Sequence, residues 1–335
     1  GDSTYNALND ALNNGYRSID TASLYKCEHY IGHFLKENEI KPFIDDLNHQ
    51  MKILSEFTTW IKDKIENSKD DKTDEVDIAD IDFSNWKLTL PVDENNNGSP
   101  DEYQPDVLIN LGYQTLDSVV PFMYDDIEDS SIVFYTFPDV STTNRSYSRT
   151  ELRELIHPSN ARDNWTLLEG GEMKGRLKVD SVSENNESSD DYHKIIVMQI
   201  HGIISQEDVD IHGFSSNNGP PLIKIYWKDG YVWCHKKSLI DESTEGNALL
   251  ETSNNTWTDI KVNLGYAGFE AFDFRITATD ARLEVQLNQD TPFVYEDISL
   301  DKWPYENYFK AGNYLTSTNS DAFSYVKYYE LSISH

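Results

Sequence analysis

Two arginines flank a carboxylate in the segment Ser148–Glu154, which reads S-R-T-E-L-R-E. Successive side chains of an extended strand alternate between its two faces, so Arg149, Glu151 and Arg153 are expected to share one face. Guanidinium groups donate paired hydrogen bonds in a fixed geometry that matches a carboxylate. By itself the segment is equally consistent with a salt-bridge ladder on an exposed sheet and with a binding site for an acidic ligand.

Two later segments favour the binding site. Lys194–Gly202 reads K-I-I-V-M-Q-I-H-G, an apolar run that ends with Gln199 and His201 on one face of a strand. Tyr308–Tyr314 reads Y-F-K-A-G-N-Y, and its alternate residues share a face in the same way. Those residues are Tyr308, Lys310, Gly312 and Tyr314. The glycine is predicted to leave room for a ligand, and the three segments together suit an acidic sugar.

The three segments, in this order, resemble the signatures R-[ST]-E-L-R, Q-[IV]-H and Y-F-K-A-G-x-Y-x-Q of the alginate lyases of polysaccharide lyase family 7. Trp86–Asp93, W-K-L-T-L-P-V-D, also looks like the start of that family's domain, so the resemblance runs from about Phe83 to the C-terminus. It implies an all-β fold, a β-jelly roll of antiparallel sheets with a concave substrate groove. One departure is Thr316, where the third signature has Gln, and it concerns a substrate contact and not the chemistry.

The resemblance implies cleavage of alginate by β-elimination at 4-O-linked uronates, which leaves 4,5-unsaturated oligosaccharides. This reaction needs neutralisation of the sugar carboxylate, a base for the C5 proton and an acid for the departing O4. Arg149 and Gln199 would donate to the carboxylate, where one well-placed donor is worth roughly 10²–10³ in rate. His201 would be the base and Tyr314 the acid, with reference pKa values of about 6.5 and 10. The expected substrate-binding residues are Glu151, Arg153, Tyr308 and Lys310, with Glu151 placed to hold the arginines.

Substrate preference depends on the geometry of the two uronates of alginate. In mannuronate the C5 proton and O4 leave from the same face, so Tyr314 alone could act as base and acid. In guluronate they leave from opposite faces, which requires His201 as a separate base. Ile at the middle of Q-[IV]-H is associated in the family with guluronate, so Ile200 favours guluronate-containing blocks. Cleavage within the chain and cleavage from its ends both stay open.

Two other functions compete with the lyase as interpretations of these motifs. A glycoside hydrolase needs two carboxylates that flank the groove, but Glu151 is the only acid within the three motifs. A sugar-binding module without catalysis would have no use for His201 together with Tyr314. The lyase therefore accounts best for the whole set.

The composition limits the classes of partner that the protein can bind. A net charge of −31 over 335 residues excludes nucleic acid, whose phosphates require a basic surface. A polyanionic substrate is compatible with this charge if the cations are concentrated in one groove. Surface acidity suits a salty medium, and an enzyme of this family is expected to be secreted. No apolar run approaches 18 residues, so no membrane partner is expected.

Metals and cofactors are not expected. Asp93–Gly98 matches the first half of a calcium loop, but Gln104 stands where such a loop has Glu, and an Asn-Gly turn is the preferred interpretation. The cysteines, Cys27 and Cys234, cannot build a metal site by themselves, and the histidines show no ligand spacing.

The first quarter of the chain differs from the rest in its predicted secondary structure. Residues 1–66 are expected to be mainly helical, 67–82 form an acidic linker, and 83–335 form the β domain. Residues 5–38 resemble a fragment of the aldo-keto reductases, but one βα unit cannot close that family's barrel, so no reductase activity is expected. Ile44–Ile65 predicts an amphipathic helix. A monomer is preferred over a dimer paired through this helix, because barely three heptads are present.

Overall fold

The computed structural model describes residues 78–139, 147–251 and 255–335. The chain divides between Glu75 and Val76, and all of the described residues belong to the second unit, Val76–His335. The predicted helical region 1–66, its reductase-like fragment, the Ile44–Ile65 helix and most of the linker lie outside the described residues. In the part of the chain that the structure describes, no helix is long and apolar enough to cross a membrane.

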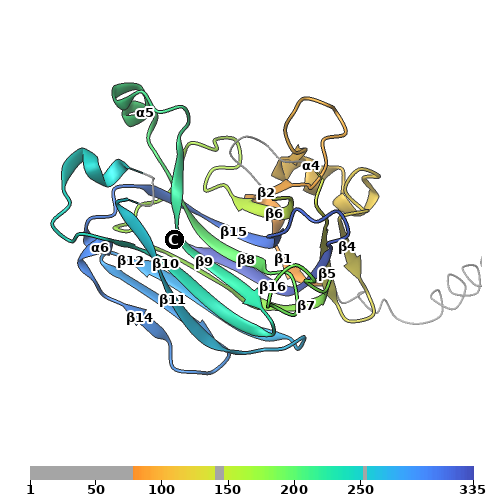
Figure 1. Ribbon diagram of the computed structural model, residues 1–335. Coiled ribbons are helices and arrows are strands. Elements are labelled where there is room, and N and C mark those ends of the chain that lie inside the picture. Colours follow the sequence, from red (N-terminus) through yellow and green to blue (C-terminus); the bar gives the residue numbers. More distant parts are fainter. Residues whose placement is uncertain (1–77, 140–146, 252–254) are drawn as a thin grey trace, which may run out of the picture. The chain divides into compact units, whose positions relative to one another are not determined.

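Two sheets of eight strands make up the described unit (Figure 1). We call them the groove sheet and the outer sheet. The groove sheet contains β2 (Trp86–Thr89), β3 (Glu102–Tyr103), β6 (Arg149–Glu154), β8 (Ile195–Ile203), β9 (Asn218–Lys228), β10 (Tyr231–Leu239), β11 (Trp257–Tyr266) and β15 (Glu306–Leu315). The outer sheet contains β1 (Asp80–Ile81), β4 (Met123–Asp126), β5 (Ser131–Thr136), β7 (Gly171–Val182), β12 (Phe272–Thr279), β13 (Arg282–Leu287), β14 (Phe293–Tyr295) and β16 (Ser324–Ser334).

The order of strands confirms the predicted jelly-roll sandwich. The groove sheet runs β11-β10-β9-β8-β15-β6-β2-β3, and the outer sheet runs β14-β13-β12-β7-β16-β5-β4 with β1 added beside β16. Pairing is antiparallel throughout except between β1 and β16. The short helices are η2 (Phe83–Asn85), α4 (Pro105–Asn110), η3 (Tyr113–Thr115), α5 (Gln206–His212), η4 (Gly246–Leu250) and α6 (Ile298–Asp301). In Figure 1, α5 projects away from the sheets.

The core lies between the two sheets and follows from strand alternation. In β6, Leu152 is fully buried, while its neighbours Glu151 and Arg153 belong to the opposite face. Ile200 and Phe309 occupy the same inward positions on β8 and β15. Each such side chain stabilises the fold by about 1.5–3 kcal/mol on burial. The apolar face of these strands therefore anchors the groove sheet and leaves its polar face available for a site.

Polar contacts through the core fix β15 against both sheets. Asn313, fully buried, donates hydrogen bonds to the carbonyls of Phe134 and Ser324, both 2.8 Å away, on two strands of the outer sheet. The Tyr328 hydroxyl, from β16, donates to the Val197 carbonyl of β8 at 2.5 Å. Because buried polar groups must be satisfied, these bonds specify one position for β15.

Gly312 on β15 corrects one prediction. It has φ +140°, and a Cβ built there would lie 2.6 Å from the Thr150 carbonyl oxygen and 2.8 Å from the Glu151 Cα. Its N–H donates to the Tyr328 hydroxyl at 3.0 Å. The pairing of β15 with β8 shifts register between Ala311 and Tyr314. The glycine is therefore needed for close approach of the neighbouring strand β6, and not to leave room for a ligand.

Candidate functional site

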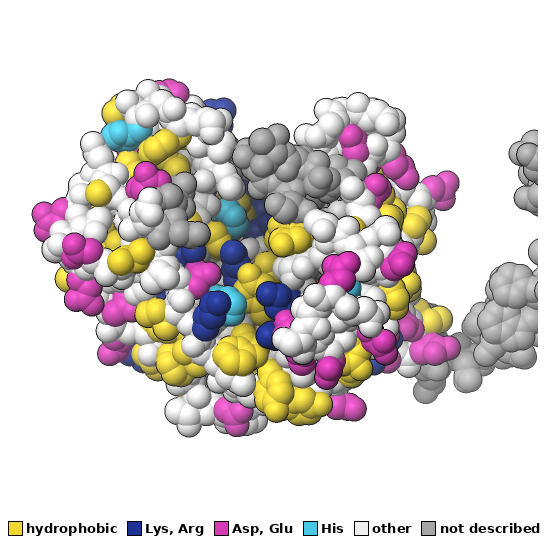
Figure 2. All heavy atoms as spheres, in the orientation of Figure 1, with side chains coloured by type: hydrophobic (Ala, Val, Ile, Leu, Met, Phe, Trp, Pro, Cys, Tyr) yellow, Lys and Arg dark blue, Asp and Glu magenta, His cyan; other side chains and the backbone are white. Residues whose placement is uncertain are grey.

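The three sequence motifs lie on adjacent strands of the groove sheet. On β15, Tyr314 pairs with Arg149 of β6, and Lys310 pairs with Gln199 of β8. A cavity of about 830 Å³ opens over these strands. Six of the eight predicted residues line it: Arg149, Gln199, His201, Tyr308, Lys310 and Tyr314. Figure 2 shows Lys, Arg and His side chains gathered in a hollow, with acidic side chains spread around it.

Loops that the motifs did not indicate form the walls of this cavity. One wall comes from the segment after β2, where Asn95, Asn97 and Asp101 line the cavity. The other comes from the turn before β9, with residues 216–218. Both segments are rich in Asn and Ser, which in the sequence indicated turns and carried no sign of a site.

Glu151 lies beneath the groove surface as the centre of a charge cluster. It is 2% exposed and accepts a hydrogen bond from the Gln199 amide nitrogen at 2.6 Å. Its carboxylate also forms ion pairs with Lys310 and, at 3.4 Å, with Arg149. Burial alone would raise the pKa of Glu151, but the charges of Lys310 and Arg149 and the hydrogen bonds outweigh it, so the pKa is held below its usual range. Glu151 is therefore ionised and orients the groups above it.

Arg149 and Tyr314 form a stacked pair. The guanidinium carbon of Arg149 lies 3.9 Å from the centre of the Tyr314 ring. This distance is within the range of a cation–π contact, and the cation also stabilises negative charge that develops on the phenol oxygen. The Tyr147 ring lies edge-on to the Tyr314 ring, with centroids 6.3 Å apart. The phenol is thus held between a cation and an aromatic ring.

His201 is held as a neutral imidazole with a defined tautomer. Its Nδ1 lies 2.9 Å from the Gly202 carbonyl oxygen, which can only accept, so Nδ1 carries the proton and Nε2 carries the lone pair. Burial and then the charges of Lys310, Arg149 and Lys224 lower the pKa of His201 to about 3, against the opposing effect of the Gly202 hydrogen bond. The ring stacks on Tyr308 with centroids 5.3 Å apart. Its Nε2 is available to accept a proton at neutral pH.

Arg153 lies on the groove face at the edge of the site. Its guanidinium donates to the carbonyls of Glu154 (2.6 Å) and Ala161 (2.8 Å) and to the Asn164 side chain (2.8 Å). It also lies 4.1 Å from the centre of the Tyr308 ring. These contacts tie the loop after β6 to the underside of Tyr308. Of the four residues predicted to bind substrate, Tyr308 and Lys310 line the main cavity, and Glu151 and Arg153 do not. Arg153 lines a smaller adjoining hollow of about 70 Å³ together with Arg149, Tyr308 and Lys310.

The loop that follows β2 has the geometry of a turn. The carboxylate of Asp93 accepts hydrogen bonds from the backbone N–H groups of Asn97 (2.9 Å) and Gly98 (2.8 Å). Asp101 accepts from the N–H of Glu94 at 3.0 Å. These carboxylates are used to shape the loop, which favours the turn over the calcium loop. Within residues 78–139, 147–251 and 255–335, no group of three or more His, Cys, Asp or Glu side chains is arranged to hold a metal ion.

Comparison with known proteins adds to this geometry. A family model described as alginate lyase matches residues 81–335. A protein of Klebsiella pneumoniae named alginate lyase is 26% identical over 298 residues, which cover 76% of this chain and 90% of that protein. The solved structure of the family 7 alginate lyase A1-II′, in complex with a product written GGG, has a TM-score of 0.58 at 28% identity and covers 76% of this chain and 97% of that one.

A second solved structure is similar in fold. The alginate lyase from Klebsiella pneumoniae has a TM-score of 0.58 at 20% identity and covers 76% of this chain and 97% of that one. The resemblance of residues 5–38 to aldo-keto reductases is not borne out, since the matching family model begins at residue 81 and those residues lie outside the described ones. One βα unit that lacks the rest of a barrel is too little sequence to indicate a family.

Proposed function

The chain belongs to the alginate lyase family, and from this premise we propose that it cleaves alginate by β-elimination at 4-O-linked uronates and leaves 4,5-unsaturated oligosaccharides. One observation supports the proposal: a neutral imidazole and a phenol lie in the groove beside side chains that can donate hydrogen bonds to a substrate carboxylate. The donors are Arg149, Gln199 and Lys310, and the proton-transfer groups are His201 and Tyr314.

The first step is neutralisation of the uronate carboxylate. Arg149, Lys310 and ionised Glu151 together carry a net charge of +1, so the cluster still attracts one carboxylate after Glu151 is counted. Gln199 donates one amide N–H to Glu151, which turns the amide toward the groove and leaves its second N–H for the substrate. As the C5 proton departs, negative charge moves onto the carboxylate. Donors placed in advance then stabilise the transition state more than the bound substrate.

The second step moves two protons. Nε2 of His201 accepts the C5 proton from guluronate, and the imidazolium that forms is stabilised by the uronate carboxylate nearby. The Tyr314 hydroxyl protonates O4 as the glycosidic bond breaks. In mannuronate, where both groups leave from one face, Tyr314 acts as a phenolate that has lost its proton to solvent: it takes the C5 proton and passes this proton to O4. The contact with Arg149 favours this because a cation stabilises the phenolate.

We further propose a preference for guluronate-containing blocks. The support is that His201 has the tautomer and the neutral state that a separate base requires. Ile200, the residue that suggested this preference, is fully buried in the core. Any effect of Ile200 on substrate choice therefore acts through the position of β8, which carries Gln199 and His201 on its other face.

We also propose that the enzyme is secreted and works as a monomer. Its substrate is an external polymer, and the net charge of −31 suits a medium in which salt screens repulsion. The described residues of one chain line the cavity over the three motifs, which supports a monomer.

Digestion of alginate tests the proposed reaction. The products should carry the near-ultraviolet absorbance of a 4,5-unsaturated uronate, and the activity should persist in chelator. Reducing ends that appear without this absorbance would indicate hydrolysis and contradict the proposal. Comparison of initial rates on polyguluronate and polymannuronate tests the preference separately.

A further inference from the structure

A row of polar residues crosses the groove sheet at right angles to its strands. Each residue of the row is the direct partner of the next one, so all of them share the groove face. In strand order the row is Arg153, Lys310, Gln199, Lys224, His235 and Lys261. Lys224 lines the main cavity, whereas His235 and Lys261 lie beyond it on β10 and β11. Strands are about 4.8 Å apart, so the row continues roughly 14 Å past Gln199.

The far half of this row is positively charged in a strongly acidic chain. On the groove face, β9, β10 and β11 carry four lysines, Lys224, Lys228, Lys237 and Lys261, and one acidic residue, Asp259, although the whole chain has a net charge of −31. The fifth lysine of these strands, Lys236, is buried on the opposite face and pairs with Asp297. The lysines act on one another and on the histidine between them. Burial and the charges of Lys261, Lys194 and Lys224 lower the pKa of His235 to about 4, against the opposing effect of Asp259. Like charges that repel one another in the empty protein are stabilised when an anion binds among them.

Asp259 is the one acidic residue that β9, β10 and β11 themselves carry on the groove face, whereas Lys228, at the end of β9, pairs with Asp190 from a loop. Asp259 forms an ion pair with Lys237 at 2.7 Å, and the two residues are direct partners on β11 and β10. A hollow of about 350 Å³ is lined by Lys237, Thr258, Asp259 and Lys261. Burial alone would raise the pKa of Asp259, but Lys237 and the other cations outweigh it and hold the pKa below its usual range. Asp259 thus stays ionised and occupies the place that a ligand carboxylate would take.

We propose that β9–β11 form a second carboxylate-binding site, which holds a uronate several residues away from the cleaved bond. Lys224, His235 and Lys261 form its row of donors, and Asp259 competes with the substrate for Lys237. The polymer then lies across the strands, with its reacting uronate over β6, β15 and β8. The inference rests on the proposed function, and it adds that long chains are preferred over short ones.

Two single substitutions with opposite expected effects test this site. Lys261→Gln removes an exposed cation from the row, and Asp259→Asn removes the competing carboxylate. Lys174→Gln on β7 of the outer sheet is the matched control, because it removes an exposed lysine that lies 3.9 Å from Glu172 and far from the groove sheet row. The measurement is the ratio of kcat/KM for long alginate to kcat/KM for the shortest oligomer that the wild type cleaves.

At low salt, Lys261→Gln should lower this ratio about two- to five-fold and Asp259→Asn should raise it by a similar factor, as expected for one exposed and one partly exposed charge. Both differences should disappear at about 1 M salt, where the Debye length is about 3 Å. A ratio that neither substitution changes, or that Lys174→Gln changes equally, would overturn the second site. A wild type that forms no unsaturated product from any alginate would instead contradict the proposed function. Since Lys261 is exposed, its variant gives a result even if Asp259→Asn fails to fold.

Discussion

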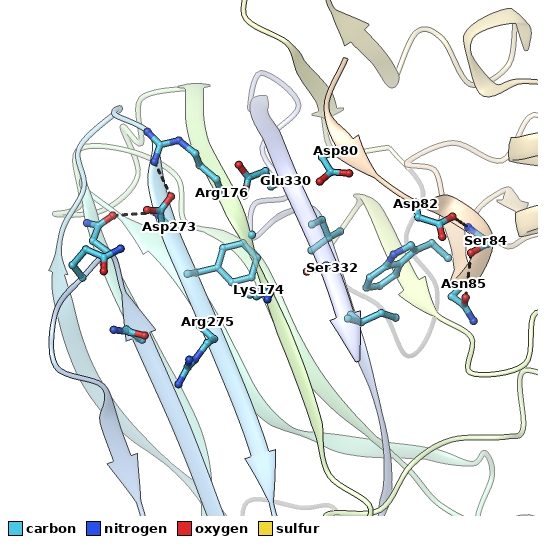
Figure 3. Close-up of a pocket in the computed structure, with 18 residues that line it drawn as sticks. Asp80, Asp82, Ser84, Asn85, Lys174, Arg176, Asp273, Arg275, Glu330 and Ser332 are labelled. Atoms are coloured by element: carbon cyan, nitrogen blue, oxygen red, sulfur yellow. Dashed lines mark hydrogen bonds and ion pairs between the residues drawn. The ribbon is translucent and has the colours of Figure 1, made fainter. Parts of the chain in front are cut away.

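Two cavities of similar size lie on opposite faces of the sandwich, and their charges distinguish them. The groove cavity, about 830 Å³, is lined by three cations and two acids, while an outer cavity of about 900 Å³ is lined by three cations and four acids. Figure 3 shows the outer cavity, whose cations are Lys174, Arg176 and Arg275. Volume alone would favour the outer cavity. Only the groove cavity suits an anionic polymer.

The two cavities also differ in how their cations are paired with carboxylates. In the outer cavity Arg176 forms an ion pair with Asp273 at 2.7 Å, and both side chains are more than 40% exposed. Solvent screens such pairs, so they hold neither partner rigidly. In the groove, Glu151 is fully enclosed and orients Arg149 and Lys310 from below. A buried carboxylate that orients the donors lining the cavity is thus the feature that separates a prepared site from a charged surface.

The largest effect is expected from Tyr314→Phe. Without the hydroxyl, O4 has no proton donor in either uronate, so kcat should fall at least about 10³-fold on polyguluronate and polymannuronate alike. The ring and its contact with Arg149 persist, so the folded state should be preserved by circular dichroism. Residual activity above a hundredth of the wild type on either polymer would show that another group protonates O4.

Glu151→Gln against Asp273→Asn tests the comparison of the two cavities directly. Removal of the buried charge leaves Lys310 and Arg149 without their partner, which should destabilise the protein by about 3–5 kcal/mol and lower kcat. The same change in the outer cavity should cost about 0–1 kcal/mol and leave kcat unchanged. Urea unfolding and initial rates measure both. Equal losses in the two variants would mean that burial does not separate the cavities.

His201→Asn should affect the two uronates unequally. Only the opposite-face elimination of guluronate needs a separate base, so the loss on polyguluronate should exceed the loss on polymannuronate by about ten-fold or more. Equal losses on both polymers would remove the distinction between one-base and two-base elimination, although the lyase function would stand.

The low pKa of His201 also predicts how stability changes with pH. The folded state holds the neutral imidazole, with a pKa of about 3, while the unfolded chain binds a proton near pH 6.5. This contribution to stability is therefore complete above pH 6.5 and is lost progressively as the pH falls toward 3. The free energy of unfolding of His201→Asn should decrease less than that of the wild type between pH 7 and 5. A parallel decrease would show that the imidazole is not held neutral.

Strand periodicity predicted which residues of each motif share a face, and family resemblance predicted that the faces meet. Gly312 shows what this reasoning lacks, because a glycine is required there by the backbone of β6, which is about 160 residues away in the chain. Arg153 shows the same limit: two of its hydrogen bonds go to Ala161 and Asn164, in a loop whose path no local pattern indicates. The sequence predicts which face of a strand a residue occupies. Which group each side chain donates its hydrogen bonds to depends on the segments that pack beside it.

The smallest effect is expected from removal of residues 1–77. The chain enters the described unit next to Asp80, which pairs with Glu330 of β16 and lines the outer cavity, so the deletion ends on the side away from the groove. All of the groove residues belong to the family-matched region 81–335, which is long enough to bury its own core. A chain that begins at Ile78 should therefore fold and keep its kcat within about two-fold on short oligomers. A chain that begins at Asp82 is the informative control, because it also loses β1 and its pairing with β16. If the Ile78 chain were insoluble or inactive while the full chain is active, residues 1–77 would contribute to the fold or to the groove. The difference between the groove cavity and the outer cavity could then not be explained by residues 78–335 alone.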